Sequence, residues 1–170
     1  MDRERTRGAN LKIVALLMWG WLWASDGSAQ APAVANSQPD YHPSMGDLMT
    51  MAIQPRHTKL WQAGRAGNWV YAEYELTELR NAFTRVARTI PTYRNADMTA
   101  LIGAMTTQPL QAVEDSIRGK DAVRFKTAYA QLTTTCNACH VSQEHAMVVI
   151  RVPSGDTYPD QDFNGTASAR

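Results

Sequence analysis

Apolar side chains recur at steps of three and four over most of the chain between residues 44 and 145, which is typical of helices that bury one face. The clearest stretch begins near Asn68 and stops before Pro91, because proline disfavours helix in the residue that precedes it. Its apolar positions alternate without a break: Trp69, Ala72, Leu76, Leu79, Phe83, Val86 and Ile90. This seam predicts a helix within a bundle.

A helix is also predicted on the N-terminal side of this seam. It should run from Ser44, a suitable N-cap, to about Ala63, and the glycine-rich residues 64–67 should end it. We expect a kink at Pro55, because proline removes a backbone donor.

Two more helical elements are predicted after Pro91. One should be interrupted, with a piece over residues 97–105 and another over residues 109–117, since Pro109 suits a first helical turn. The last should begin at Asp121 and carry these residues inward: Phe125, Ala128, Tyr129, Leu132, Cys136 and Cys139. The predicted fold is therefore all-α, an antiparallel four-helix bundle over residues 44–145.

The last predicted helix carries the run Cys136-Asn-Ala-Cys139-His140, and these are the only two cysteines in the chain. The thiols at i and i+3 and the imidazole at i+4 share one helical face. Two thiols at this spacing can bond to the two vinyl groups of a haem, while the adjacent histidine binds the iron. The motif predicts one covalently attached haem c per chain, near the C-terminal end of the fourth helix.

Other uses of a cysteine pair fit this sequence less well. A structural zinc site needs four ligands, and no second cysteine pair exists here. A thioredoxin-like dithiol belongs after a strand in a βαβ unit, which the flanking sequence does not provide. A disulfide stays an alternative in an exported protein.

The N-terminus predicts export. Four basic residues precede an apolar run over residues 13–24, and small residues follow it, so residues 1–31 are expected to be a cleaved signal peptide. The apolar run is shorter than the roughly 20 residues that span a bilayer. We expect a periplasmic protein without stable membrane insertion, although three tryptophans in the run make an uncleaved anchor an alternative.

Removal of residues 1–31 would leave 13 basic and 13 acidic residues. This balance argues against nucleic acid or an anionic membrane as the main partner, because both need clustered basic side chains. Residues 32–43 are expected to form a flexible leader. Residues 146–170 should be a C-terminal extension, with an extended strip at residues 147–152 and aromatic side chains, Tyr158 and Phe163, that cover a haem edge.

The haem motif near the end of a fourth antiparallel helix resembles the class II c-type cytochromes, the cytochrome c′ type of bundle. The chain is also similar to a group of exported proteobacterial haem proteins, through stretches such as Ile53-Gln-Pro-Arg-His57, Gly67-Asn-Trp69 and Tyr74-Glu-Leu76. Both resemblances imply haem and a helical fold. One position departs from the c′ pattern, since Glu144 stands where those proteins usually carry an arginine.

The residue on the other side of the iron decides the function. If the first and fourth helices are adjacent and antiparallel, Met49 is level with His140 and becomes the expected sixth ligand. Met45, one turn earlier, is the first alternative, and His57 lies about 12 Å further along the axis. His42 and His145 are weaker candidates, Met51 should point elsewhere, and all the methionines can also be simple core residues.

Three function classes follow from these alternatives. A six-coordinate iron with an axial methionine suits an electron carrier, which is the expected function, with an unidentified redox protein as partner. A vacant sixth position suits a protein that binds small gases such as nitric oxide or carbon monoxide. An enzyme would also need a distal acid or base, and no such group is apparent, so no enzymatic activity is expected. A homodimer is compatible with any of these.

Overall fold

The structure, a computed structural model, describes residues 41–165. The predicted signal peptide and nearly all of the predicted leader lie outside these residues. Within them the chain consists of helices, one two-stranded hairpin and irregular segments. The predicted all-α class is therefore confirmed.

The first long helix is continuous but changes its geometry along its length. α1 (Met45–Leu48), the π-helical segment η1 (Met49–Ile53) and α2 (Gln54–Arg65) follow one another without a break. Ser44 caps the start, where its hydroxyl accepts the Asp47 N–H and its own N–H donates to the Asp47 carboxylate. The expected disturbance near Pro55 takes the form of η1, in which the Gln54 N–H donates to the Met49 carbonyl five residues back.

Two further helices begin at the predicted positions. α3 (Trp69–Thr89) is capped by Asn68, whose side chain accepts the Tyr71 N–H. α5 (Ala122–Ser142) is capped by Asp121, whose carboxylate accepts the N–H groups of residues 123 and 124. Caps of this kind satisfy backbone donors that have no partner within the helix, and they explain why both boundaries could be predicted.

The predicted interruption before Pro109 is wrong. α4 (Met98–Arg118) passes through Pro109 as one helix of 21 residues. Proline in a helix interior costs about 3 kcal/mol, and here it removes the donor for the Met105 carbonyl. The helix persists because Leu110, Val113 and Ile117 beyond the proline are buried in the core.

A short antiparallel hairpin joins α3 to α4. Its strands are β1 (Thr92–Tyr93) and β2 (Ala96–Asp97), and Arg94 in the turn between them has a positive φ of 53°. This hairpin was not among the predicted elements. An extended strip was predicted over residues 147–152, but in the structure these residues form no strand.

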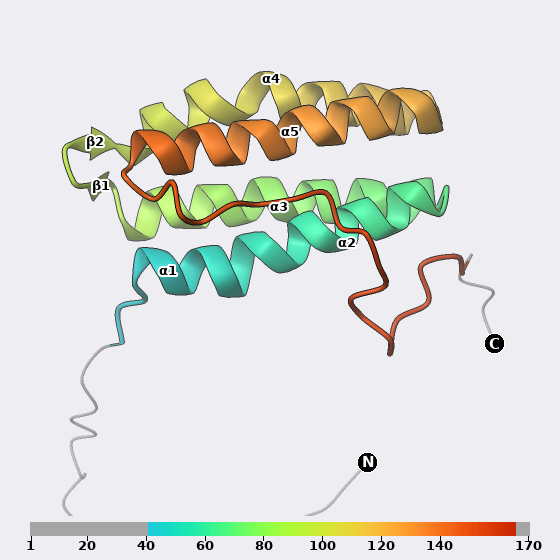
Figure 1. Cartoon of the computed structure of the whole chain (residues 1–170), viewed down its shortest axis with the longest axis horizontal. Helices are drawn as coiled ribbons and strands as arrows, with labels where there is room; N and C mark the ends of the chain where they lie inside the picture. The colour runs from blue at the N-terminus through green and yellow to red at the C-terminus, as the bar shows by residue number, and fades with distance from the viewer. Residues whose placement is uncertain (1–40, 166–170) are drawn as a thin grey trace, which may run out of the picture. The chain divides into compact units, whose positions relative to one another are not determined.

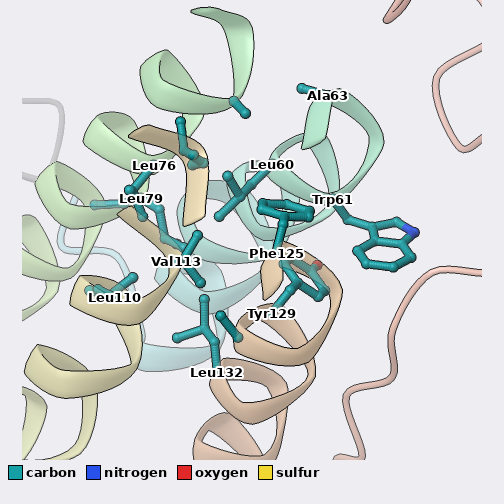
Figure 2. Close-up of a cluster of buried hydrophobic side chains, with 14 of the residues drawn as sticks. Leu60, Trp61, Ala63, Leu76, Leu79, Leu110, Val113, Phe125, Tyr129 and Leu132 are labelled. Atoms are coloured by element: carbon teal, nitrogen blue, oxygen red, sulfur yellow. The ribbon is translucent and has the colours of Figure 1, made fainter. Parts of the chain in front are cut away.

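The four long helices pack side by side, each running opposite to the one before it (Figure 1). α2 contacts α3 and also α5, while α4 contacts both α3 and α5. Figure 2 shows the core that they share, in which Phe125 and Tyr129 lie between a group of leucines with Val113 on one side and Trp61 on the other. The start of α1, the hairpin and the end of α5 gather at one end of the helices (Figure 1).

Candidate functional site

A cavity of about 260 Å³ lies at the end of the helices where α5 finishes. α5 contributes Cys136, Cys139 and His140 to its lining, so the structure brings the three motif side chains together. The remaining lining is largely apolar and comes from the first helix, α3, α4 and the chain after α5, including these residues: Met45, Met49, Ile53, His57, Phe83, Met98, Ile102, Met105, Leu132, His145, Val148 and Ile150.

The two thiols are half-buried and form no disulfide with each other. Burial, and then the neighbouring thiol, raises the pKa of Cys136 to about 11, and burial raises the pKa of Cys139. Reactive redox dithiols have a lowered pKa instead. Both thiols line a largely apolar cavity, which places them to bond to an apolar group.

His140 is held in one tautomer. Its Nδ1 lies 2.8 Å from the Val148 carbonyl oxygen, and since a carbonyl only accepts, Nδ1 carries the proton. In the neutral ring Nε2 then keeps its lone pair, which is the form that binds a metal. The donor set therefore fits a haem, with two thiols for its vinyl groups and one imidazole nitrogen for its iron.

The first helix presents a row of side chains to the same cavity. Met45, Met49, Ile53 and His57 are spaced by four residues, and in an α-helix each such step rotates the side chain by about 40°. The wider turn of η1 reduces this drift, so all four residues line the cavity. Met51 is 70% exposed and points elsewhere, as expected.

Three histidines considered as iron ligands differ in their surroundings. His57 is buried, with Nε2 3.1 Å from the Thr133 hydroxyl and Nδ1 2.9 Å from the Tyr129 hydroxyl. In His145, Nδ1 donates to the Gln143 carbonyl and Nε2 lies 3.3 Å from the Tyr93 hydroxyl. Both rings would have to give up hydrogen bonds to reach a metal.

His42, the third histidine, is exposed and does not line the cavity.

His57 has a further property that favours a role in the core. Burial lowers its pKa from 6.5 to about 4, so the ring is neutral at pH 7. Two hydroxyl groups hold the ring. The Tyr129 hydroxyl lies 2.9 Å from Nδ1 and donates to the His57 carbonyl oxygen, while the Thr133 hydroxyl lies 3.1 Å from Nε2 and donates to the Tyr129 carbonyl oxygen.

Several features of the site were not predicted. Met98 and Met105 of α4 line the cavity together with Met45 and Met49, so four thioethers face it. Sequence spacing shows which residues share a face of one helix. It does not show whether that face of α4 is turned towards the cavity. The only available signal was the amphipathic pattern of α4, in which Met98, Ile102 and Met105 share a face.

The aromatic residues of the C-terminal extension are placed differently from the prediction. Neither Tyr158 nor Phe163 lines the cavity. Phe163 is buried against the ring of Tyr71, and Lys59 lies over the ring of Tyr158. Residues 148 and 150 face the cavity instead, because the chain turns back immediately after α5.

Charged residues beside the motif and along α2 are paired. Glu144, which replaces the arginine of the c′ pattern, forms an ion pair with Arg94 of the hairpin turn. Arg56 pairs with Glu75 at 3.2 Å, and Arg65 pairs with Asp156 at 2.6 Å. These arginines are therefore engaged with protein carboxylates.

Two further findings apply to residues 41–165. No group of three or more His, Cys, Asp or Glu side chains in this range could hold a metal ion, and no helix there is long and apolar enough to cross a membrane. Comparisons with protein-family models, curated proteins and solved structures found no match to this chain.

Proposed function

We propose that the chain is a monohaem c-type cytochrome that binds one haem c covalently through Cys136 and Cys139, with His140 as an axial ligand. The observation that carries this proposal is that the Cys-Asn-Ala-Cys-His run places two neutral thiols and a free imidazole nitrogen on one apolar cavity. A haem bound there would supply one-electron redox chemistry.

Each residue of the site would then have a separate role in holding the haem. Cys136 and Cys139 would tether the haem, His140 would offer Nε2 to its iron, and the apolar lining would exclude water from its surface. Paired helices and the motif near the end of α5 favour an antiparallel four-helix bundle of the cytochrome c′ type, which agrees with the sequence resemblance.

The electron-carrier function depends on a sixth ligand, for which we propose Met49. Met49 lies on the first helix and lines the same cavity as His140, and the first helix contacts α5 through α2. The imidazole nitrogens of His57 and His145 are occupied by hydrogen bonds. A thioether ligand would raise the reduction potential and suit electron transfer to a redox protein.

A second candidate function is the binding of small gases by a five-coordinate haem. The apolar character of the cavity favours it, because an open iron in such a pocket would accept nitric oxide or carbon monoxide. In either case we propose a periplasmic protein that is not an enzyme, with export directed by residues 1–31. The balance of charge supports protein partners rather than nucleic acid.

Absorption spectra of single variants separate these functions. The ferric protein should be low-spin with a sulfur-to-iron charge-transfer band, and Met49→Ala should abolish that band and open the iron to carbon monoxide. Met51→Ala is the matched control, because Met51 belongs to the same π-helical segment but is exposed.

Variants of Met45, Met98 and Met105 test the other thioethers that line the cavity. Loss of the band in one of these variants, but not in Met49→Ala, would move the sixth ligand to that residue. A high-spin wild-type protein that binds carbon monoxide at once would favour the gas-binding function.

A further inference from the structure

The chain after α5 turns back along the helix and supplies the hydrogen-bond acceptor of His140. The Val148 carbonyl oxygen accepts from Nδ1 at 2.8 Å. We define residues 143–150 as the return segment. The position of its backbone decides whether His140 keeps this bond.

Side-chain packing does not explain how the return segment is held at Val148. The side chains of Met147 and Val149 are 79% and 61% exposed, and Val148 itself is 44% exposed. Exposed side chains contribute little to fixing a backbone, so polar contacts have to do so.

Asn137 provides the polar contact on one side of Val148. Its Nδ2 donates to the Ile150 carbonyl at 2.9 Å, and its Oδ1 accepts the Ile150 N–H at 2.7 Å. The side-chain amide thus pairs with both backbone groups of one residue, much as a neighbouring strand would. Asn137 stands between the two motif cysteines, one helical turn before His140.

On the other side of Val148, the segment is tied to the end of α5. The Val148 N–H donates to the His145 carbonyl at 2.9 Å, and the His145 N–H donates to the His140 carbonyl at 2.7 Å. Val148 is therefore fixed between a turn at His145 and the amide pair at Ile150.

We infer that Asn137 is a positioning residue for the iron ligand, because it holds the Val148 carbonyl on Nδ1 of His140. This inference rests on the proposed function. A fixed Nδ1–H donor bond sets the ring orientation and raises the basicity of Nε2, which favours the ferric state and lowers the reduction potential. Residue 137, which lies between the two cysteines of the motif, thereby acts on His140.

The test uses the haem-loaded protein and the variant Asn137→Ala. The exchange of the His140 Nδ1 proton with water should be slow in the wild type and fast in the variant, as followed by proton magnetic resonance of the low-spin ferric state. The midpoint potential should rise in the variant, while the amount of haem per chain and the helical circular dichroism stay the same.

Two more variants keep the test decisive if Asn137→Ala folds poorly. Asn137→Asp can accept the Ile150 N–H but cannot donate to the Ile150 carbonyl, so it should also speed proton exchange and raise the potential. Asn81→Ala is the matched control, since it removes an exposed amide of α3 that contacts Glu78 and should change neither quantity.

The possible failures can be told apart. Wild-type protein without covalent haem would overturn the proposed function and, with it, this inference. Haem-loaded Asn137 variants with wild-type proton exchange and potential would overturn the inference alone.

Discussion

Two glycines in long helices should respond in opposite ways to replacement by alanine. Gly64 lies inside α2, and a Cβ atom built on it would be 2.1 Å from Cζ of Phe125. Gly103 lies inside α4, and a Cβ atom there would meet no other atom within 4 Å. Replacement by alanine therefore creates a steric clash at residue 64, whereas at residue 103 it only raises the helix propensity.

The magnitudes follow from these surroundings. Phe125 is fully buried and contacts the rings of Trp61, Trp69 and Tyr129, so it cannot move aside. Overpacking of this kind costs roughly 3 kcal/mol, against a gain of about 1 kcal/mol from replacing glycine in a helix. Gly64→Ala should lose about 2 kcal/mol of unfolding free energy, and Gly103→Ala should gain up to about 1 kcal/mol.

Thermal unfolding followed by helical circular dichroism measures both variants. The melting temperature should fall by about 8 °C in Gly64→Ala and rise by up to about 4 °C in Gly103→Ala. A stable Gly64→Ala protein would refute the close packing of α2 on α5. A strongly destabilised Gly103→Ala protein would refute the open space beside that residue.

Two other predictions concern acid stability and processing. Between pH 7 and pH 5 the protein should lose about 2 kcal/mol of unfolding free energy through His57, because its folded pKa of about 4 lies below its ordinary 6.5 and the unfolded chain takes up the proton first. The contribution of His57 is complete above pH 6.5 and disappears as the pH falls towards 4. In urea titrations, the unfolding free energy of His57→Gln should therefore depend less on pH than that of the wild type. Parallel pH dependences of the two proteins would contradict a buried, neutral His57. N-terminal sequencing of the exported protein should begin near Gln30 or Pro32, and an intact Met1 in a membrane fraction would replace the periplasmic hypothesis with an anchored protein.

Local signals predicted most of the helix boundaries. Ser44, Asn68 and Asp121 cap the helices that were expected to start there, because a cap is chosen by the few backbone groups beside it. Gly67, with φ of 73°, ends the first helix as a glycine-rich end requires. Gly64 was assigned to the same end, but it lies within the helix and is small because Phe125 packs against it.

Features that depend on tertiary packing could not be predicted from one sequence. Pro109 was expected to interrupt a helix, yet the buried residues on both sides of it keep α4 continuous. The π-helical η1 has no distinctive sequence pattern, although it brings Met49 and His57 to one cavity.

The candidate site was predicted in part. The motif identified Cys136, Cys139 and His140 because their chemistry depends on spacing within one helix. Their common cavity with Met49 depended on the pairing of two distant helices, and in the structure all four residues line one cavity. The contributions of Met98 and Met105 depended on the rotation of α4 towards the cavity, and that of the return segment depended on the path of the chain after α5.

The central claim is that Cys136 and Cys139 hold one haem covalently. The full chain is produced in a bacterial host that attaches haem to exported c-type cytochromes. The purified protein is then extracted with acidified acetone, and its intact mass is measured. A variant with Cys136→Ser and Cys139→Ser provides the matched control.

If both cysteines hold the haem, the pigment should stay with the wild-type protein and its mass should exceed that of the processed chain by one haem, while the double variant carries no covalent pigment. Pigment that passes into the acetone, or a wild-type mass equal to that of the chain alone, would show that the haem is not covalently held.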